Sequence, residues 1–348
     1  MSVLSLLLAC TSEAPDAVLA YVRDEDGAGY TVAPRALPEL TDPRTMSGTL
    51  GDVRHGGRIV GTGTAERYTG GRALAVRFVE KDGVAVPLDQ DGLLVYSFYG
   101  HLADAVNELD AHGVDTSPIF PIDLAWNPAV SPLLELSPAD NAAYAIGANL
   151  FLLLPDGDNR DVPLLANAGV VTHELGHALL HLLMVGDPLI DPIVTDATTL
   201  PGMWQASLHE GFADSLAVLL LDDARFLDAS IEMPAREVDA DAALTTALLP
   251  NPLALEGSLL PVYDPYPLGT VFASVVWDIR LATDDPGATL DLLLRGVRAW
   301  APEDEDDIEG GAFLGALVGA ADPGLQYDAA CAAIDARIGD LLVVDGCP

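Results

Sequence analysis

The stretch VVTHELGHALLH, residues 171–182, combines residue types that can bind a metal ion and use it. His173 and His177 are four residues apart, so on a helix both imidazoles project from one face, about one turn apart. This spacing suits two ligands of one tetrahedral zinc ion. Glu174 is offset around the helix by about 100°, so its carboxylate can reach water at the metal rather than the metal itself. The pattern predicts a zinc helix with a neighbouring general base. An apolar helix that happens to contain histidines is the alternative.

A catalytic zinc site needs a third protein ligand, and the segment SLHEGFADSLAVLL, residues 207–220, offers one. His181 lies two turns beyond His173, about 12 Å along the helix axis, which is too far to share a zinc ion with it. Glu210 and Asp214, in contrast, are four residues apart on a second predicted helix and share a face. Glu210 is therefore the candidate third ligand. Asp214 is the candidate hydrogen-bond partner for the far nitrogen of a ligating histidine.

A competing interpretation of the same segment is a helix start. Ser207 and Glu210 have the spacing of a capping box, which would place Glu210 in the first turn of the helix. That interpretation leaves Asp214 unexplained on an apolar helix face, where a carboxylate needs a partner. His209 is expected at the surface or at the rim of a pocket rather than among the ligands.

The two motifs together, H-E-x-x-H followed by a helix with E-x-x-x-D, resemble those of the gluzincin zinc metallopeptidases, particularly the thermolysin and fungalysin families. The likeness covers roughly residues 140–282, and the zinc motifs are its specific part. It implies that Asn141 and Ala142 lie on an edge strand and grip the backbone of a peptide substrate. It also implies a thermolysin-like α+β fold of two lobes, β-rich and helical, with the zinc helix between them.

One position departs from the pattern of these families. The segment YDPYPLGTVFASVVWDIR is similar to the fungalysin helix that follows a catalytic histidine, three residues before a glycine. Tyr266 stands in that place, three residues before Gly269. A tyrosine hydroxyl can donate a hydrogen bond to the oxyanion of a tetrahedral intermediate, as gluzincin aminopeptidases do. Tyr266 is therefore a candidate catalytic residue, with Tyr263 as the second choice. A core or loop aromatic residue is the alternative.

These residues together predict a zinc-dependent peptidase that acts on a peptide or protein substrate. Zinc held by His173, His177 and Glu210 would polarise the scissile carbonyl and lower the pKa of its water toward about 7. Glu174 would take the proton from water and deliver it to the leaving amine. The competing hypothesis is a surface-anchored lipoprotein that keeps zinc for structure or binding only. The base argues against it, because a structural site does not need one.

The charge of the chain limits its partners. Acidic residues number 53 against 16 basic ones, so the formal net charge is -37, and Lys81 is the only lysine. Such a surface repels nucleic acid and anionic membranes, so we expect neither as a partner. A monomer with a solvated acidic surface is expected. Calcium is a second candidate cation, at Asp156, Asp158 and Asp161 or near Asp187 and Asp191; solvated turns are the alternative.

The start of the chain and its cysteines bear on location. Residues 1–10 end in Leu-Leu-Ala-Cys, which resembles the end of a bacterial lipoprotein signal, with Cys10 as the lipid-bearing residue. No basic residue precedes this short apolar run, so a plain apolar N-terminus is the alternative. We expect an exported protein, either an outer-membrane or cell-surface lipoprotein or a secreted one. Export would let Cys331 and Cys347 form a disulfide.

The order of patterns along the chain gives an α+β layout. Residues 11–45 are expected to form a linker, residues 46–95 a β-rich N-terminal module, and residues 96–348 the catalytic domain. A strand is expected in residues 141–155. Helical periodicity and stop signals predict helices over residues 99–114, 168–185, 205–222, 268–282, 287–300, 311–320 and 326–338.

Overall fold

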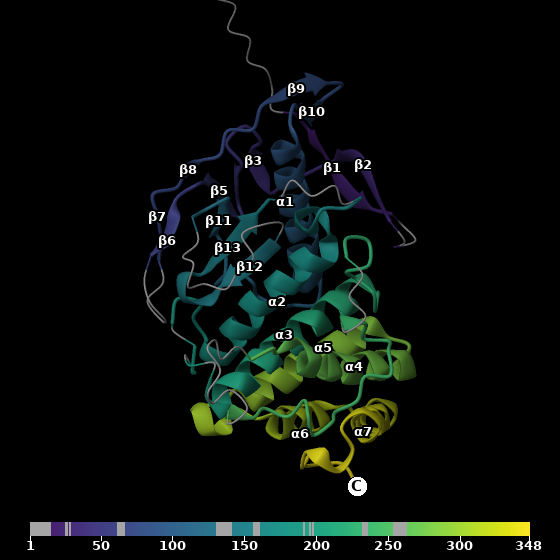
Figure 1. The fold of residues 1–348 in the computed structure, drawn as a ribbon. Helices are drawn as coiled ribbons and strands as arrows, with labels where there is room; N and C mark the ends of the chain where they lie inside the picture. Colours follow the sequence, from purple (N-terminus) through teal and green to yellow (C-terminus); the bar gives the residue numbers. More distant parts are fainter. Residues whose placement is uncertain are drawn as a thin grey trace, which may run out of the picture.

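The fold was analysed in a computed structural model of the 348-residue chain (Figure 1). The structure describes residues 15–24, 27, 29–60, 67–129, 141–155, 161–190, 192–194, 196, 198–231, 236–252 and 263–348. Within these residues the protein is α+β, with seven α-helices and three sheets. In the view of Figure 1 the sheets lie in the upper part, and helices α2 to α7 form the lower part.

The largest sheet ends in an edge strand that lies against helix α2 (Ala168–Val185). Its strands follow the order β12-β13-β11-β5-β4-β3, and β8 pairs with β5. Strand β11 runs parallel to both β5 and β13, whereas the edge strand β12 is antiparallel to β13. The predicted strand in residues 141–155 is thus two strands joined by a short 3-10 turn. The strands are β3 (Leu40–Asp42), β4 (Ser47–Gly48), β5 (Gly51–His55), β8 (Arg72–Ala73), β11 (Ile122–Trp126), β12 (Asn141–Ala145) and β13 (Leu150–Leu154).

A second sheet shows that the predicted linker is wrong. Strands β1 and β2 form an antiparallel hairpin inside residues 11–45, and β1 also pairs in parallel with β10. Val18 and Ala20 alternate with less buried residues along β1, a period-2 pattern that the Pro- and Asp-rich composition around it obscured. The remaining strands are β1 (Ala17–Arg23), β2 (Tyr30–Arg35), β9 (Phe78–Lys81) and β10 (Val84–Pro87), with β6 (Arg58–Val60) and β7 (Arg67–Thr69) as a separate pair.

Helix α1 (Gln90–Ala111) begins nine residues earlier than predicted. The Asp89 side chain caps it by accepting a hydrogen bond from the Gly92 backbone N–H. The run GLLVYSFY, which we interpreted as a strand, lies in its first half and is buried except for Leu93, which is partly exposed. A short continuous apolar run does not distinguish a buried strand from a buried helix. The boundary predicted between residues 95 and 96 therefore falls inside one helix.

The predicted C-terminal helices are present, and α3 begins five residues earlier than predicted. They are α2 (Ala168–Val185), α3 (Leu200–Leu221), α4 (Tyr266–Thr283), α5 (Pro286–Trp300), α6 (Gly310–Ala320) and α7 (Leu325–Arg337). Helix α2 passes the length and composition test for a membrane span, but 83% of that stretch is buried inside the molecule, as in a core helix. Cys331 and Cys347 form a disulfide with a Cα–Cα distance of 5.4 Å, as expected. Cys10 lies outside the described residues.

The N-terminal hairpin is hydrogen-bonded to the start of α2 and the end of α3, the two helices that carry the candidate metal ligands. The Tyr30 hydroxyl donates to Asn167 Oδ1 (3.2 Å) and accepts from the Ala168 N–H (2.8 Å) at the start of α2. The Arg23 guanidinium donates to the Leu221 carbonyl (2.9 Å) and to Asp223 (2.7 Å) at the end of α3. The segment predicted to be a linker is thus part of the scaffold of the site.

Candidate metal centre

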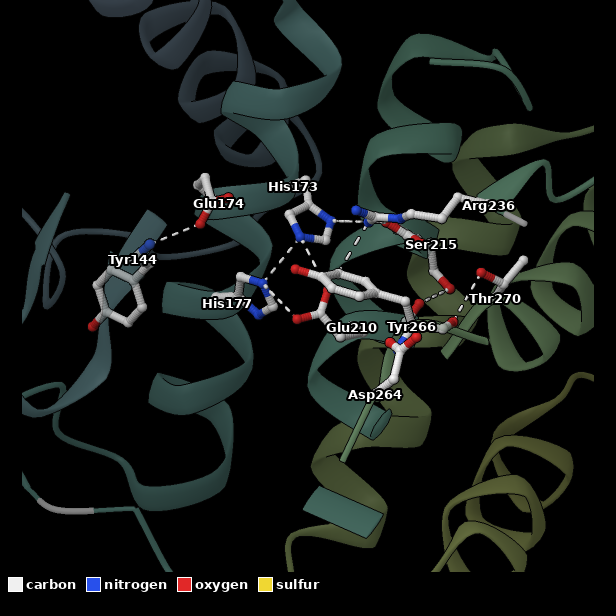
Figure 2. Close-up of polar contacts among 12 residues, drawn as sticks. Tyr144, His173, Glu174, His177, Glu210, Ser215, Arg236, Asp264, Tyr266 and Thr270 are labelled. Atoms are coloured by element: carbon white, nitrogen blue, oxygen red, sulfur yellow. Dashed lines mark hydrogen bonds and ion pairs between the residues drawn. The ribbon is translucent and has the colours of Figure 1, made fainter. Parts of the chain in front are cut away.

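Helix α2 carries the two histidines on one face (Figure 2). It begins at Asn167, whose side chain accepts from the Gly169 N–H, and it ends at Gly186, which has a left-handed backbone. The His173 and His177 rings lie with centroids 4.6 Å apart, and their Nε2 atoms are 3.0 Å apart. The four-residue spacing therefore places both imidazoles beside one point, as predicted.

Helix α3 brings Glu210 to the same point. The distance from His173 Nε2 to Glu210 Oε2 is 3.3 Å, and that from His177 Nε2 to Glu210 Oε1 is 3.8 Å. Donor atoms of all three residues lie within 4.8 Å of one another. Ligands at about 2.0–2.1 Å from a tetrahedral zinc ion are about 3.3 Å apart. The three side chains therefore fit a zinc ion without a change of helix packing.

Glycines allow the three helices to approach this closely. A Cβ atom on Gly176 of α2 would lie 2.6 Å from the Cα of Ala213 on α3. A Cβ atom on Gly269 of α4 would lie 2.7 Å from the Cβ of Glu210. Contacts this short do not occur between real side chains, so larger residues would push the helices apart. Gly176 and Gly269 thus allow the short distances between the helices that bring the three candidate ligands together.

Asp214 lies where the sequence placed it, behind the first histidine. Its side chain is fully buried, and its Oδ1 is 2.8 Å from His173 Nδ1. This contact leaves Nε2 of the same ring for a metal ion and fixes the tautomer and the orientation of the ring. Helix α3 starts at Leu200, with Thr199 as its N-cap, so Glu210 is in the middle of the helix. The capping-box interpretation of Ser207 and Glu210 is therefore wrong.

Arg236 is a residue of the site that the sequence did not reveal. Its guanidinium donates a hydrogen bond to Asp214, approaches Glu210 Oε2 at 3.9 Å, and lies 4.4 Å from the centre of the Tyr266 ring. It lies between α3 and α4, at a position where no sequence periodicity predicts the direction of its side chain. The buried carboxylate of Asp214 was the available signal, because a second charged partner reduces the cost of burying it.

Burial and the neighbouring carboxylates shift the pKa values of His173 and His177 in opposite directions. Burial alone would lower the pKa of His173, but hydrogen bonds to Asp214 and Glu210 outweigh it and raise this pKa to about 9. Burial lowers the pKa of His177 to about 4, against the attraction of the Glu210 carboxylate. Glu210 Oε2 is also buried without a well-aligned hydrogen bond. A divalent cation among the three would satisfy this oxygen and hold both imidazoles neutral.

Figure 2 shows the Glu174 carboxylate between the two imidazoles and Tyr144 of the edge strand. Its Oε2 accepts a hydrogen bond of 2.7 Å from the backbone N–H of Tyr144 on β12. Burial, reinforced by the Glu210 carboxylate, raises the pKa of Glu174 to about 7, although His173 opposes this. A carboxylate that exchanges a proton near neutral pH, held between the ligands and a strand edge, is suited to general base chemistry.

Of the two candidate tyrosines, Tyr266 lies at the ligand group. Figure 2 shows its phenol directed from the start of α4 toward the two imidazoles, and 38% of the residue is exposed. The negative charge of Glu210 and burial raise its pKa, so the hydroxyl keeps its proton. The Tyr263 hydroxyl is instead hydrogen-bonded to Ser207 at 2.8 Å. Tyr266 is thus the available hydrogen-bond donor.

The remaining predicted residues are only partly brought to the site. Asn141 and Ala142 lie on the edge strand β12, as expected, but outside the ligand group. His209 is buried rather than at a surface, and neither ring nitrogen has a hydrogen-bond partner among the described residues. Of the candidate calcium residues, Asp161 and Asp187 are described, whereas Asp156, Asp158 and Asp191 lie outside the described residues. Asp187 accepts a hydrogen bond from the Leu189 N–H in a local turn.

The comparisons with known proteins add no assignment. No family model matches the chain, and no curated protein matches it. The functional conclusion therefore depends on the geometry of the site.

Proposed function

We propose that this chain is a zinc-dependent peptidase of the gluzincin type. The observation that supports this most is the convergence of His173, His177 and Glu210 from two helices, with the carboxylate of Glu174 held beside them. Two histidines and a glutamate are a ligand set of catalytic zinc sites, which keep one position open. A carboxylate that binds no metal but lies next to the ligands is the further requirement of hydrolysis.

Each residue has a definite task in this proposal. Zinc, when bound, supplies Lewis-acid polarisation of a carbonyl oxygen and a lower pKa of water. Glu174 accepts a proton from the attacking water at its carboxylate and passes it to the leaving nitrogen, so that the C–N bond breaks with a neutral amine as the leaving group instead of an amide anion. Tyr266 donates its hydroxyl proton in a hydrogen bond to the oxyanion. Asp214 holds His173 in the ligating tautomer.

The placement of the edge strand supports a peptide as the substrate. Among the strands that the structure describes, β12 pairs only with β13, and Glu174 contacts β12 at Tyr144. An extended peptide that adds to such an edge brings its own backbone past the ligand group. In this proposal Asn141 and Ala142 bind that backbone. The β-rich part, the helical part and the zinc helix between them then correspond to the two lobes of a thermolysin-like fold.

The setting of the protein is a further part of the proposal. The Cys331–Cys347 disulfide supports an exported protein, because such bonds persist in oxidising compartments. The acidic surface supports solubility as a monomer without nucleic acid partners. A lipid anchor at Cys10 and a calcium site remain predictions from the sequence.

The test compares wild type with Glu174→Gln in zinc binding and in cleavage of a broad peptide library. Glutamine keeps the size of the side chain but cannot accept the proton, so zinc binding should survive while hydrolysis falls by at least about 100-fold. Glu108→Gln, an exposed change on α1, serves as the matched control and should cleave as wild type does. If wild type binds zinc but cleaves nothing, a structural or binding role for the metal replaces the proposal.

A further inference from the structure

A groove lies beyond the end of the edge strand, apart from the metal ligands. It has a volume of about 1010 Å³ and lies at the starts of the parallel strands β5, β11 and β13, where the segment after α2 forms its opposite side. Gly48, Gly51 and Gly147 are among its lining residues. The charged side chains that line it are Asp52, Asp123, Asp187 and Arg67.

The groove lies near the end of β12, on the chain just after this strand. The Tyr144 N–H contacts Glu174 near one end of this strand, and the groove begins at Gly147, three residues further along the chain. Three residues span at most about 10 Å. A peptide that lies along β12 past Glu174 therefore reaches the groove with residues about three to five positions from the reacting bond.

The side chains of the groove favour a positive partner. Its described lining residues include three carboxylates and one guanidinium. Arg54 is shared between Asp52 (3.1 Å) and Asp123 (3.4 Å), whose side chains remain 41% and 49% exposed. Leu189, at the same groove, is 74% exposed and can cover the aliphatic stem of a lysine or arginine. The net charge of -37 adds a long-range attraction for cations.

We infer that this groove is a distal subsite that binds a basic side chain of the peptide substrate, three to five residues from the scissile bond. The inference rests on the proposed peptidase function and specifies its substrate class. The subsite acts through binding of the substrate and takes no part in the chemical step.

The test uses peptides with one common core in which Lys, Ala or Glu occupies the third, fourth or fifth position on either side of the cleaved bond. Affinity is measured with zinc-loaded Glu174→Gln, and KM and kcat are measured with wild type. We expect lysine at one of these positions to bind about two- to fivefold more tightly than alanine, which is the scale of a partly exposed ion pair. Glutamate should bind more weakly than alanine. The preference should disappear in 1 M salt, where charges are screened within about 3 Å.

The matched variants are Asp123→Asn in the groove and Asp335→Asn on the exposed face of α7, which change the net charge equally. Asp123→Asn should reduce the preference for lysine through KM with kcat unchanged, whereas Asp335→Asn should not. Cleavage with no preference at any of these positions overturns the subsite and leaves the peptidase intact. Zinc binding without cleavage of any peptide overturns the peptidase, and the affinities then still show whether the groove selects lysine.

Discussion

Replacing Gly176 by alanine tests whether the spacing of two helices controls the metal site. The new Cβ would lie 2.6 Å from the Cα of Ala213, and ordinary contact begins at 3.4 Å. The two helices must therefore separate by at least 0.8 Å at this level, because the atom that is met belongs to the backbone. Metal–ligand distances tolerate only about 0.2 Å. His173 and His177 flank Gly176 on α2, so the separation moves them away from Glu210.

Two readouts distinguish this effect from a general loss of stability. Overpacking costs about 1–3 kcal/mol, but alanine recovers about 1 kcal/mol of helix propensity, so the free energy of unfolding of the apoprotein should fall by no more than about 2 kcal/mol. The zinc Kd, measured by calorimetric titration, should rise at least about 10-fold, as when groups that orient ligands are lost. Gly319→Ala on α6, where no atom lies within 4 Å, is the matched control and should bind zinc as wild type does. Wild-type zinc affinity in Gly176→Ala would refute this account of the helix spacing.

Asp214→Asn should raise the zinc Kd by about 10–100-fold. Because it leaves Arg236 buried without its carboxylate, it should also destabilise the protein by about 3–5 kcal/mol. A variant with the same zinc Kd and the same free energy of unfolding as wild type would contradict both expectations. Tyr30→Phe removes two hydrogen bonds at the start of α2, so its free energy of unfolding in urea should fall by about 1–3 kcal/mol. An unchanged free energy of unfolding would show that the hairpin does not stabilise the start of α2. Burial, with Arg35 beside the ring, lowers the pKa of His101 to about 3, so unfolding takes up a proton and stability should fall as the pH drops from about 6.5 toward 3. Between these pH values the free energy of unfolding of His101→Gln should fall less steeply than that of wild type, by up to about 1.4 kcal/mol per pH unit. The same dependence on pH in both proteins would refute the lowered pKa of His101.

The parts of the site that lie on regular helices could be predicted from the sequence. The spacing of His173 and His177, and that of Glu210 and Asp214, determines which side chains share a helix face, so their convergence required only that α2 and α3 pack together. For these four residues local periodicity was sufficient. Tyr266 was a candidate through the family resemblance alone, since the helix predicted over residues 268–282 did not include it, whereas α4 begins at Tyr266.

The parts that depend on tertiary contacts could not be predicted in the same way. Arg236 reaches Asp214 from an irregular segment 22 residues away, and no pattern encodes its direction. The hairpin of residues 17–35 is a scaffold because Arg23 and Tyr30 meet helices more than 130 residues later. The first half of α1 was interpreted as a strand because it is apolar on every side, and only its burial between other elements explains that composition.

The most direct measurement of the central claim is zinc X-ray absorption on the metal-loaded protein, together with the zinc content per chain. The account predicts one zinc ion per chain with two imidazole ligands and oxygen ligands at about 2.0–2.2 Å and no sulfur. In Glu210→Gln zinc should be bound more weakly, with both imidazoles still in place. A chain that retains no zinc, a site with sulfur ligands, or a spectrum and affinity unchanged by Glu210→Gln would contradict a zinc site formed by His173, His177 and Glu210.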